Sequence, residues 1–192
     1  MNEVPAPLVV KDLACLRGDR LLFEDLSFTV VPGGALHLEG PNGSGKSSLL
    51  RLLAGLLRPF AGQISAPALS YLGHDVALKP RMTLIRELHH WARLDGGEAR
   101  LAGAMAAMNV AGLADVPCRH LSSGQRRRAG LARAMASGAP LWLLDEPTAG
   151  LDTASAQLLA DAMAGHRAAG GMVVAAVHGD IGLLAPQVVR LG

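Results

Sequence analysis

Aromatic side chains, lysines and cysteines are all scarce in this chain of 192 residues. Six residues are aromatic, and the three lysines stand against fifteen arginines. The net charge of +2 is too small to predict a nucleic-acid partner. The two cysteines, Cys15 and Cys118, lie far apart and form neither a metal-binding spacing nor a disulfide framework, which fits a protein of a reducing compartment.

Long apolar runs are also missing. No run approaches the roughly 18 residues that a membrane span needs, and the first seven residues lack the basic and apolar regions of a signal peptide. With 192 residues the chain is long enough to bury a sizeable core. Half of the residues are hydrophobic and few are aromatic, so that core would be built of Leu, Val and Ala. We therefore expect a single domain, residues 1–192, that is soluble or reaches a membrane only through a partner.

One glycine-rich stretch carries a specific chemical pattern. Residues 40–47 fit G-x-x-x-x-G-K-[ST], the phosphate-binding loop, between an expected strand at 35–39 and an expected helix at 48–57. Lys46 would reach the β- and γ-phosphates of a nucleotide, and the Ser47 hydroxyl would bind Mg²⁺. A plain glycine-rich turn between strand and helix is the alternative. The predicted phosphate-binding residues are Gly40, Pro41, Asn42, Gly43, Ser44, Gly45, Lys46, Ser47 and Ser48.

The order of apolar and polar residues predicts an α/β fold. Apolar runs without polar alternation are typical of parallel strands buried on both faces, whereas the alternating N-terminal runs favour an antiparallel hairpin. From residue 75 to about 137 the composition is helical, and Thr83 and Ser122 are N-cap candidates, Ser122 in a capping box with Gln125. The expected strands are 8–16, 21–31, a short strand at Ile64, 69–72, 141–144 and 172–177, and the expected helices include 83–91, 98–109 and 153–169.

The strand at 141–144 ends in two acidic residues. Asp145, at the carboxyl end of a strand beside the phosphate loop, would hold Mg²⁺. Glu146 would then polarise the attacking water as a general base. The alternative is a solvated strand end with no chemical role.

Leu121-Ser122-Ser123-Gly124-Gln125 resembles the LSGGQ signature of ATP-binding cassette (ABC) ATPases. The order of motifs also matches, because Ala149-Gly150-Leu151-Asp152 resembles the family's D-loop and His178 follows a strand as the family's switch histidine does. The resemblance implies a P-loop NTPase of ABC type, with a mostly parallel core sheet, an N-terminal antiparallel β-subdomain and an inserted helical subdomain at about 75–137. The core would then comprise residues 1–74 and 138–192. It also implies that Ser122 and Gly124 bind the ATP held by a second subunit, and that His178 contacts the γ-phosphate.

Three positions depart from the family pattern. Ser123 replaces the first signature glycine. Arg17 stands where the family has an aromatic residue under adenine, and its guanidinium either stacks on the base or points to solvent. His74 stands where the family has the Q-loop glutamine, and would touch Mg²⁺ or the attacking water.

Residues 71–75, 78–84 and 87–88 resemble the ATP-binding subunit of the bacterial haem exporter of cytochrome c maturation. This resemblance implies ATP and Mg²⁺ as cofactors, and a homodimer of ATPase subunits. It implies a transmembrane haem exporter subunit and associated maturation components as partners, with docking near residues 74–91. It also implies a peripheral position on the cytoplasmic face of the inner membrane.

Other functions stay open at this point. They are an ABC subunit for another substrate, a non-transport ABC protein of translation or DNA repair, and a small P-loop kinase. No direct haem ligand is expected, because neighbouring His89 and His90 point apart on a helix and an ATPase subunit does not normally touch the substrate. The basic cluster Arg126-Arg127-Arg128 with Arg133 favours a solvated helix face or a dimer contact over nucleic acid.

Overall fold

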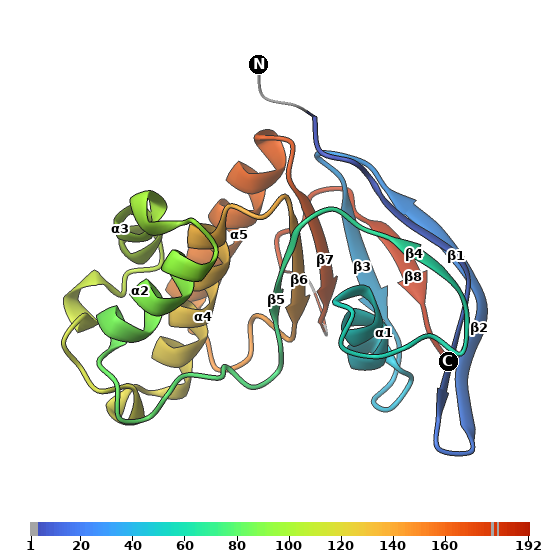
Figure 1. Cartoon of the computed structure of the whole chain (residues 1–192), viewed down its shortest axis with the longest axis horizontal. Coiled ribbons are helices and arrows are strands. Elements are labelled where there is room, and N and C mark those ends of the chain that lie inside the picture. The colour runs from blue at the N-terminus through green and yellow to red at the C-terminus, as the bar shows by residue number, and fades with distance from the viewer. Residues whose placement is uncertain (1–3, 178, 180) are drawn as a thin grey trace.

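The computed structural model describes residues 4–177, 179 and 181–192. Its elements form two sheets with helices on either side of the larger one (Figure 1). The strands are β1 (Leu8–Arg17), β2 (Arg20–Val30), β3 (Ala35–Glu39), β4 (Ala61–Ser65), β5 (Leu69–Leu72), β6 (Leu141–Asp145), β7 (Met172–Ala176) and β8 (Gln187–Arg190). The α-helices are α1 (Lys46–Leu53), α2 (Leu84–Leu94), α3 (Glu98–Ala107), α4 (Ser123–Ser137) and α5 (Thr153–Ala168), with short 3₁₀ turns at Ala111–Leu113 and Cys118–His120.

The central sheet is parallel and has the strand order β5-β6-β7-β3-β8. Alternate residues of β6 enter different cores: Leu141 and Leu143 face the core that contains α1, whereas Trp142 and Leu144 face the core that contains α2 to α5. Both faces are therefore buried, which is why this strand has no polar alternation. Because the carboxyl ends of parallel strands meet at one edge, the segments after β3, β5 and β6 come together there.

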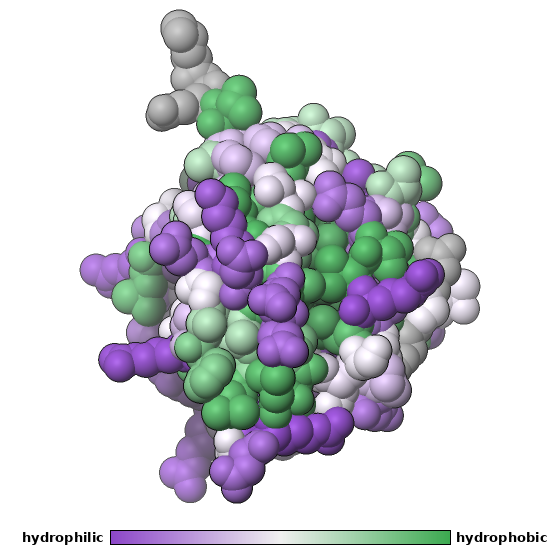
Figure 2. All heavy atoms as spheres, turned by 90° about the vertical axis from the view of Figure 1, so that its right-hand side faces the viewer, coloured by the Kyte–Doolittle hydropathy of each residue, from purple (hydrophilic) through white to green (hydrophobic). Residues whose placement is uncertain are grey.

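The smaller sheet is antiparallel, with the order β2-β1-β4. The hairpin of β1 and β2 runs from the Leu8–Val30 pair to the Arg17–Arg20 pair, as the sequence predicts. Figure 2 shows this side of the molecule, where apolar groups lie exposed among charged ones. Leu16 on β1, Leu21 on β2 and Val188 on β8 are among the exposed apolar residues. The predicted α/β fold, with a parallel sheet, an antiparallel sheet and inserted helices, is thus confirmed.

Helices α2, α3 and α4 lie together on one side of the parallel sheet (Figure 1). The capping box predicted for Ser122 and Gln125 is present at the start of α4. Thr83 does occupy the N-cap position of α2, but its side chain makes no capping hydrogen bond. Instead the first amides of α2 donate to carbonyl oxygens of the segment after α3, at 3.0 Å from Leu84 N to Val116 O and 2.9 Å from Ile85 N to Ala114 O.

Two elements differ from the prediction. Helix α1 begins within the phosphate loop and ends at Leu53, and Gly55 follows with a φ of 70°, so the helix stops before Pro59. Strand β8 was not predicted, because Gln187–Arg190 is short and gains its pairing only from β3. Within the described part of the chain, every helix is too short or too polar to cross a bilayer.

Candidate active site

The phosphate loop connects β3 to α1 and depends on three glycines. Gly40, Gly43 and Gly45 have φ values of 146°, 80° and 108°, a region that other residues rarely adopt. A side chain at Gly40 would also collide with the carbonyl oxygen of Leu191 and the hydroxyl of Ser44. The loop can therefore turn tightly in front of α1, where the amides of a helix N-terminus stabilise an anion.

Lys46 is the first residue of α1 and is 8% exposed. Its ammonium group donates to the carbonyl oxygens of Gly40 at 2.6 Å and Pro41 at 3.1 Å. These neutral acceptors hold the cation inside the curve of the loop. A positive charge in that place, next to a helix N-terminus, favours a bound phosphate.

Ser47 and Asp145, the two predicted Mg²⁺ ligands, are in contact. The Ser47 hydroxyl donates to Asp145 Oδ1 at 3.1 Å, and Asp145 is 1% exposed. Within the described residues, Asp145 Oδ2 is buried and accepts no hydrogen bond. Burial raises the pKa of the Tyr71 phenol, and the charge of Asp145 raises it further. A buried carboxylate with one unused oxygen beside a hydroxyl fits a site for a hard divalent cation.

Glu146 follows β6 with a φ of 51°, an uncommon value for a residue with a Cβ. Its amide donates to the carbonyl oxygen of Ala176 at 2.8 Å, which ties it to the end of β7. Strained backbone of this kind is concentrated at functional sites, where surrounding contacts hold it. The positive φ turns the chain sharply directly after β6, at a residue that lines the cavity.

A cavity of about 540 Å³ joins these parts. Six residues of the loop region line it together with three others, and the lining consists of Leu22, Asn42, Gly43, Gly45, Lys46, Ser47, Ser48, His74 and Glu146. Arg17, Ser122 and Gly124 do not line it. Leu22 of β2 was not predicted for the site. Its place near Gly45 depends on how the antiparallel sheet packs on the loop, so no local pattern reveals it.

The signature residues lie instead at the start of α4, next to the D-loop of the same chain. A side chain at Gly124 would come within 2.7 Å of the carbonyl oxygen of Gly150. Asp152 then caps α5, accepting from the Ser155 amide at 2.8 Å, and its hydrogen bonds with Ser155 lower its pKa. The close approach of Gly124 to Gly150 thus holds the D-loop against the signature segment. Ser122 is exposed.

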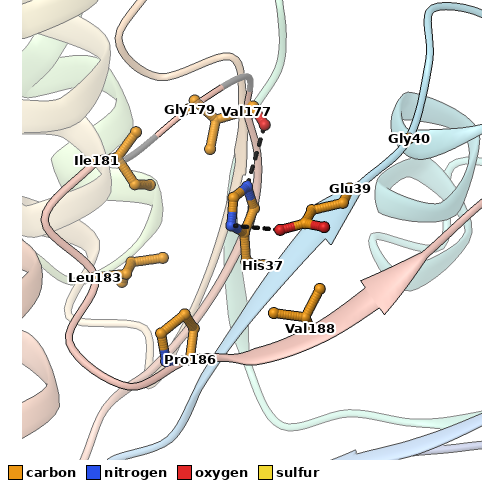
Figure 3. Close-up of a pocket in the computed structure, with 9 residues that line it drawn as sticks. All are labelled: His37, Glu39, Gly40, Val177, Gly179, Ile181, Leu183, Pro186 and Val188. Carbon is orange, nitrogen blue, oxygen red and sulfur yellow. Dashed lines mark hydrogen bonds and ion pairs between the residues drawn. The ribbon is translucent and has the colours of Figure 1, made fainter.

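The predicted switch residue His178 lies outside the described residues. Its neighbours line a second cavity of about 520 Å³ beside β3 and β8 (Figure 3). There His37 Nε2 lies 3.1 Å from the Val177 carbonyl oxygen, and Glu39 pairs with Arg190 at 3.0 Å. These polar groups already have partners, so they brace the strand ends that carry the phosphate loop.

Comparisons with known proteins agree with this geometry. The profile of the ABC transporter family matches residues 23–149. The chain is 51% identical to the Rhodospirillum rubrum protein "Cytochrome c biogenesis ATP-binding export protein CcmA", with 98% of this chain and 87% of the relative covered. It is 47% identical to the protein of the same name from Paramagnetospirillum magneticum, over 94% of this chain and 92% of the relative.

Among solved structures, an ATP-binding subunit of an ABC transporter superposes with a TM-score of 0.85 at 25% identity, covering 97% of this chain and 86% of that one. The chain belongs to the ABC transporter family of ATP-binding proteins, and within it to the cytochrome c biogenesis ATP-binding export proteins.

Proposed function

We propose that this chain is the ATP-hydrolysing subunit that powers haem export for cytochrome c maturation. The observation that carries the proposal is one cavity that joins the loop residues Lys46 and Ser47 to Glu146, with buried Asp145 against Ser47. The relatives named as export proteins of cytochrome c biogenesis support the choice of pathway. Haem as the cargo follows from the resemblance of residues 71–75, 78–84 and 87–88 to haem exporter subunits.

ATP binds with its phosphates in the loop. The loop amides and Lys46 neutralise the β- and γ-phosphates, and Leu22 offers an apolar contact near the loop. Ser47 and Asp145 would hold Mg²⁺, which supplies charge neutralisation at the transferred phosphate. Arg17 on the hairpin is the candidate for stacking on adenine, although it lies outside the cavity lining.

Glu146 acts as the general base for the attacking water. Its position on the cavity wall, in a backbone conformation fixed by the contact to Ala176, supports that role. His74 lines the same cavity and is proposed to contact the water or the metal. His178 is proposed to contact the γ-phosphate.

Two copies of the chain complete the site. At the N-terminus of α4, Ser122 is exposed and Gly124 is half-buried, and neither lines the chain's own cavity. A second copy, turned by a two-fold axis, would place its signature over the loop and so enclose ATP between the chains. ATP binding then closes the dimer and hydrolysis reopens it.

A transmembrane haem exporter subunit, with associated maturation components, is the proposed partner that uses this motion. The proposed docking region is the face near residues 74–91, in the helical subdomain at about 75–137, with the core formed by 1–74 and 138–192. There the Arg133 guanidinium lies over the Trp91 ring, 4.0 Å from its centroid. The assembly would sit on the cytoplasmic face of the inner membrane, without nucleic acid and without a direct haem ligand from this chain.

Glu146→Gln tests this function. The amide keeps the size of the side chain but cannot take a proton, so we expect turnover to fall about 100-fold or more while ATP binding persists. Because bound ATP is then not hydrolysed, the variant should accumulate as an ATP-dependent dimer in light-scattering measurements. Glu24→Gln, an exposed change on β2, is the matched control and should hydrolyse ATP normally. Normal hydrolysis by the Glu146→Gln variant would contradict the assignment.

A further inference from the structure

Arg127 is a buried cation on the signature helix that the proposed mechanism does not use. It lies in the second turn of α4 and is 5% exposed. Burial lowers the pKa of its guanidinium, and nearby carboxylates such as Asp145 and Glu146 act in the opposite direction. A charge in this environment is tolerated only where its donors are well satisfied.

Its hydrogen bonds leave the helical subdomain and end at the candidate active site. Arg127 Nη1 donates to the carbonyl oxygen of Gly73 at 2.9 Å, and Nη2 donates to that of His74 at 2.7 Å. A longer contact of 3.4 Å joins Nη1 to the carbonyl oxygen of Asp145. One planar side chain thus holds the main chain at a cavity-lining residue and at the end of β6.

The guanidinium geometry matters here. Its rigid fork presents donors to two successive carbonyl oxygens at once, whereas the ammonium of lysine is a single compact group. Arg127 is thus a direct polar link between α4 and the carbonyl oxygens of Gly73 and His74, beside the close apolar packing of Gly130 on Leu72 and Val76. A movement of α4 would be passed through this link to the segment that carries His74.

The neighbouring Arg128 makes a similar pair of bonds in a different direction. Its Nη1 donates to the carbonyl oxygens of Met108 at 3.0 Å and Asn109 at 2.7 Å, at the end of α3. Arg128 therefore joins two helices within one subdomain and does not reach the cavity. Each arginine thus donates to two successive carbonyl oxygens, Arg127 from two nitrogens and Arg128 from one, and the two side chains differ in destination.

We propose that Arg127 is a positioning residue that couples the signature helix to the catalytic edge of the chain's own cavity. Through its two short hydrogen bonds, a displacement of Ser122 and Gly124 on α4 becomes a displacement of His74. This inference rests on the proposed ATPase function and adds to it a residue outside the sequence motifs of the site. It explains a buried charge whose acceptors are main-chain carbonyl oxygens of the segment that links the sheet to the helices.

The test compares Arg127→Lys with Arg128→Lys in the full chain. Both variants keep the positive charge. Arg127→Lys loses the fork of Nη1 and Nη2, and Arg128→Lys loses the one nitrogen, Nη1, that donates to both of its carbonyl oxygens. For Arg127→Lys we expect kcat for ATP hydrolysis to fall about 10-fold or more with the KM for ATP within about threefold, because misplacement near the reacting atoms costs rate more than ground-state binding. For Arg128→Lys we expect kcat within about twofold of the native chain, since its partners lie away from the cavity.

Hydrogen exchange gives a second readout. Addition of ATP should change the protection of amides 73–76 and of the start of α4 together in the native chain. In Arg127→Lys the change should stay at α4 and be lost at 73–76.

Three results would overturn the proposal. They are an Arg127→Lys kcat within twofold of native, equal losses in both variants, or an Arg127→Lys chain that no longer unfolds cooperatively, which would show a purely structural role. A native chain that binds no ATP would instead refute the proposed function, so the two failures are distinguishable.

Discussion

The loop half and the signature half of the proposed ATP site are built in different ways. The loop half is buried and assembled by contacts distant in sequence, such as Ser47 to Asp145 at 3.1 Å. The signature half is exposed and held locally, by the capping box of Ser122 and by the approach of Gly124 to Gly150. The loop half is thus preformed within one chain. Under the proposed function, the signature half meets the ATP that another copy of the chain holds.

The largest expected effect comes from breaking the loop half. Lys46→Ala removes the cation that the carbonyl oxygens of Gly40 and Pro41 hold in the loop. We expect ATP affinity to fall about 100-fold, because a desolvated charge–phosphate contact is worth about 3 kcal/mol. Calorimetric titration with ATP measures this. Lys79→Ala, an exposed lysine, should bind as the native chain does, and equal affinity in both variants would remove Lys46 from the site.

A change in the signature half is expected to affect ATP affinity less than Lys46→Ala does, but to reduce ATP turnover clearly. Ser122→Asp keeps an N-cap of α4 and adds a negative charge where the second copy's γ-phosphate would arrive. We expect the chain to bind ATP normally and to lose turnover about 10-fold or more, by charge repulsion. Ser122→Asn has nearly the same shape and capping ability without the charge. If the two variants have the same steady-state rate, the signature does not meet a phosphate.

The smallest effect concerns the sheet beneath both halves. His166 on α5 stacks on Trp142 of β6, with ring centroids 4.0 Å apart, and burial lowers the pKa of His166. The folded chain therefore favours the neutral His166 ring. As the pH falls through about 6.5, the unfolded chain takes up a proton at His166 more readily than the folded chain does. The free energy of unfolding therefore declines with acidification in that range.

Thermal unfolding between pH 7.5 and 5.5 measures this decline. We expect His166→Phe, which keeps the stacked ring but does not titrate, to lose roughly 2–4 °C less Tm than the native chain over this range. Identical pH slopes in the two proteins would show that His166 contributes nothing to acid sensitivity.

Local patterns in the sequence were sufficient for the loop and for the start of α4. The glycines at 40, 43 and 45 serve the backbone conformation directly, and the capping box closes within four residues. Continuous apolar runs also predicted the buried strands β6 and β7, because their two faces meet two different cores.

Features that depend on tertiary contacts were missed. Thr83 is the N-cap residue of α2 as predicted, but its side chain makes no capping bond, and carbonyl oxygens of the segment after α3 accept the first two amides of the helix instead. Leu22 lines the cavity because the antiparallel sheet packs on the phosphate loop. Strand β8 is short and forms by pairing with β3. In the sequence, Arg127 belongs to a run of three arginines that favours a solvated helix face or a dimer contact, yet it is buried and bonded to Gly73 and His74. The spacing and composition of residues near one another in the sequence do not reveal contacts with segments that are distant in the sequence.

The central claim is that one chain holds half of each ATP site. Mixing the Lys46→Ala and Ser122→Asp chains tests it, because each heterodimer would combine an intact loop from one chain with an intact signature from the other. If half of the dimers are mixed and each has one intact site of two, ATPase activity should return to about a quarter of the native level. A mixture that stays as inactive as the separate variants would contradict the claim that a second copy completes the site.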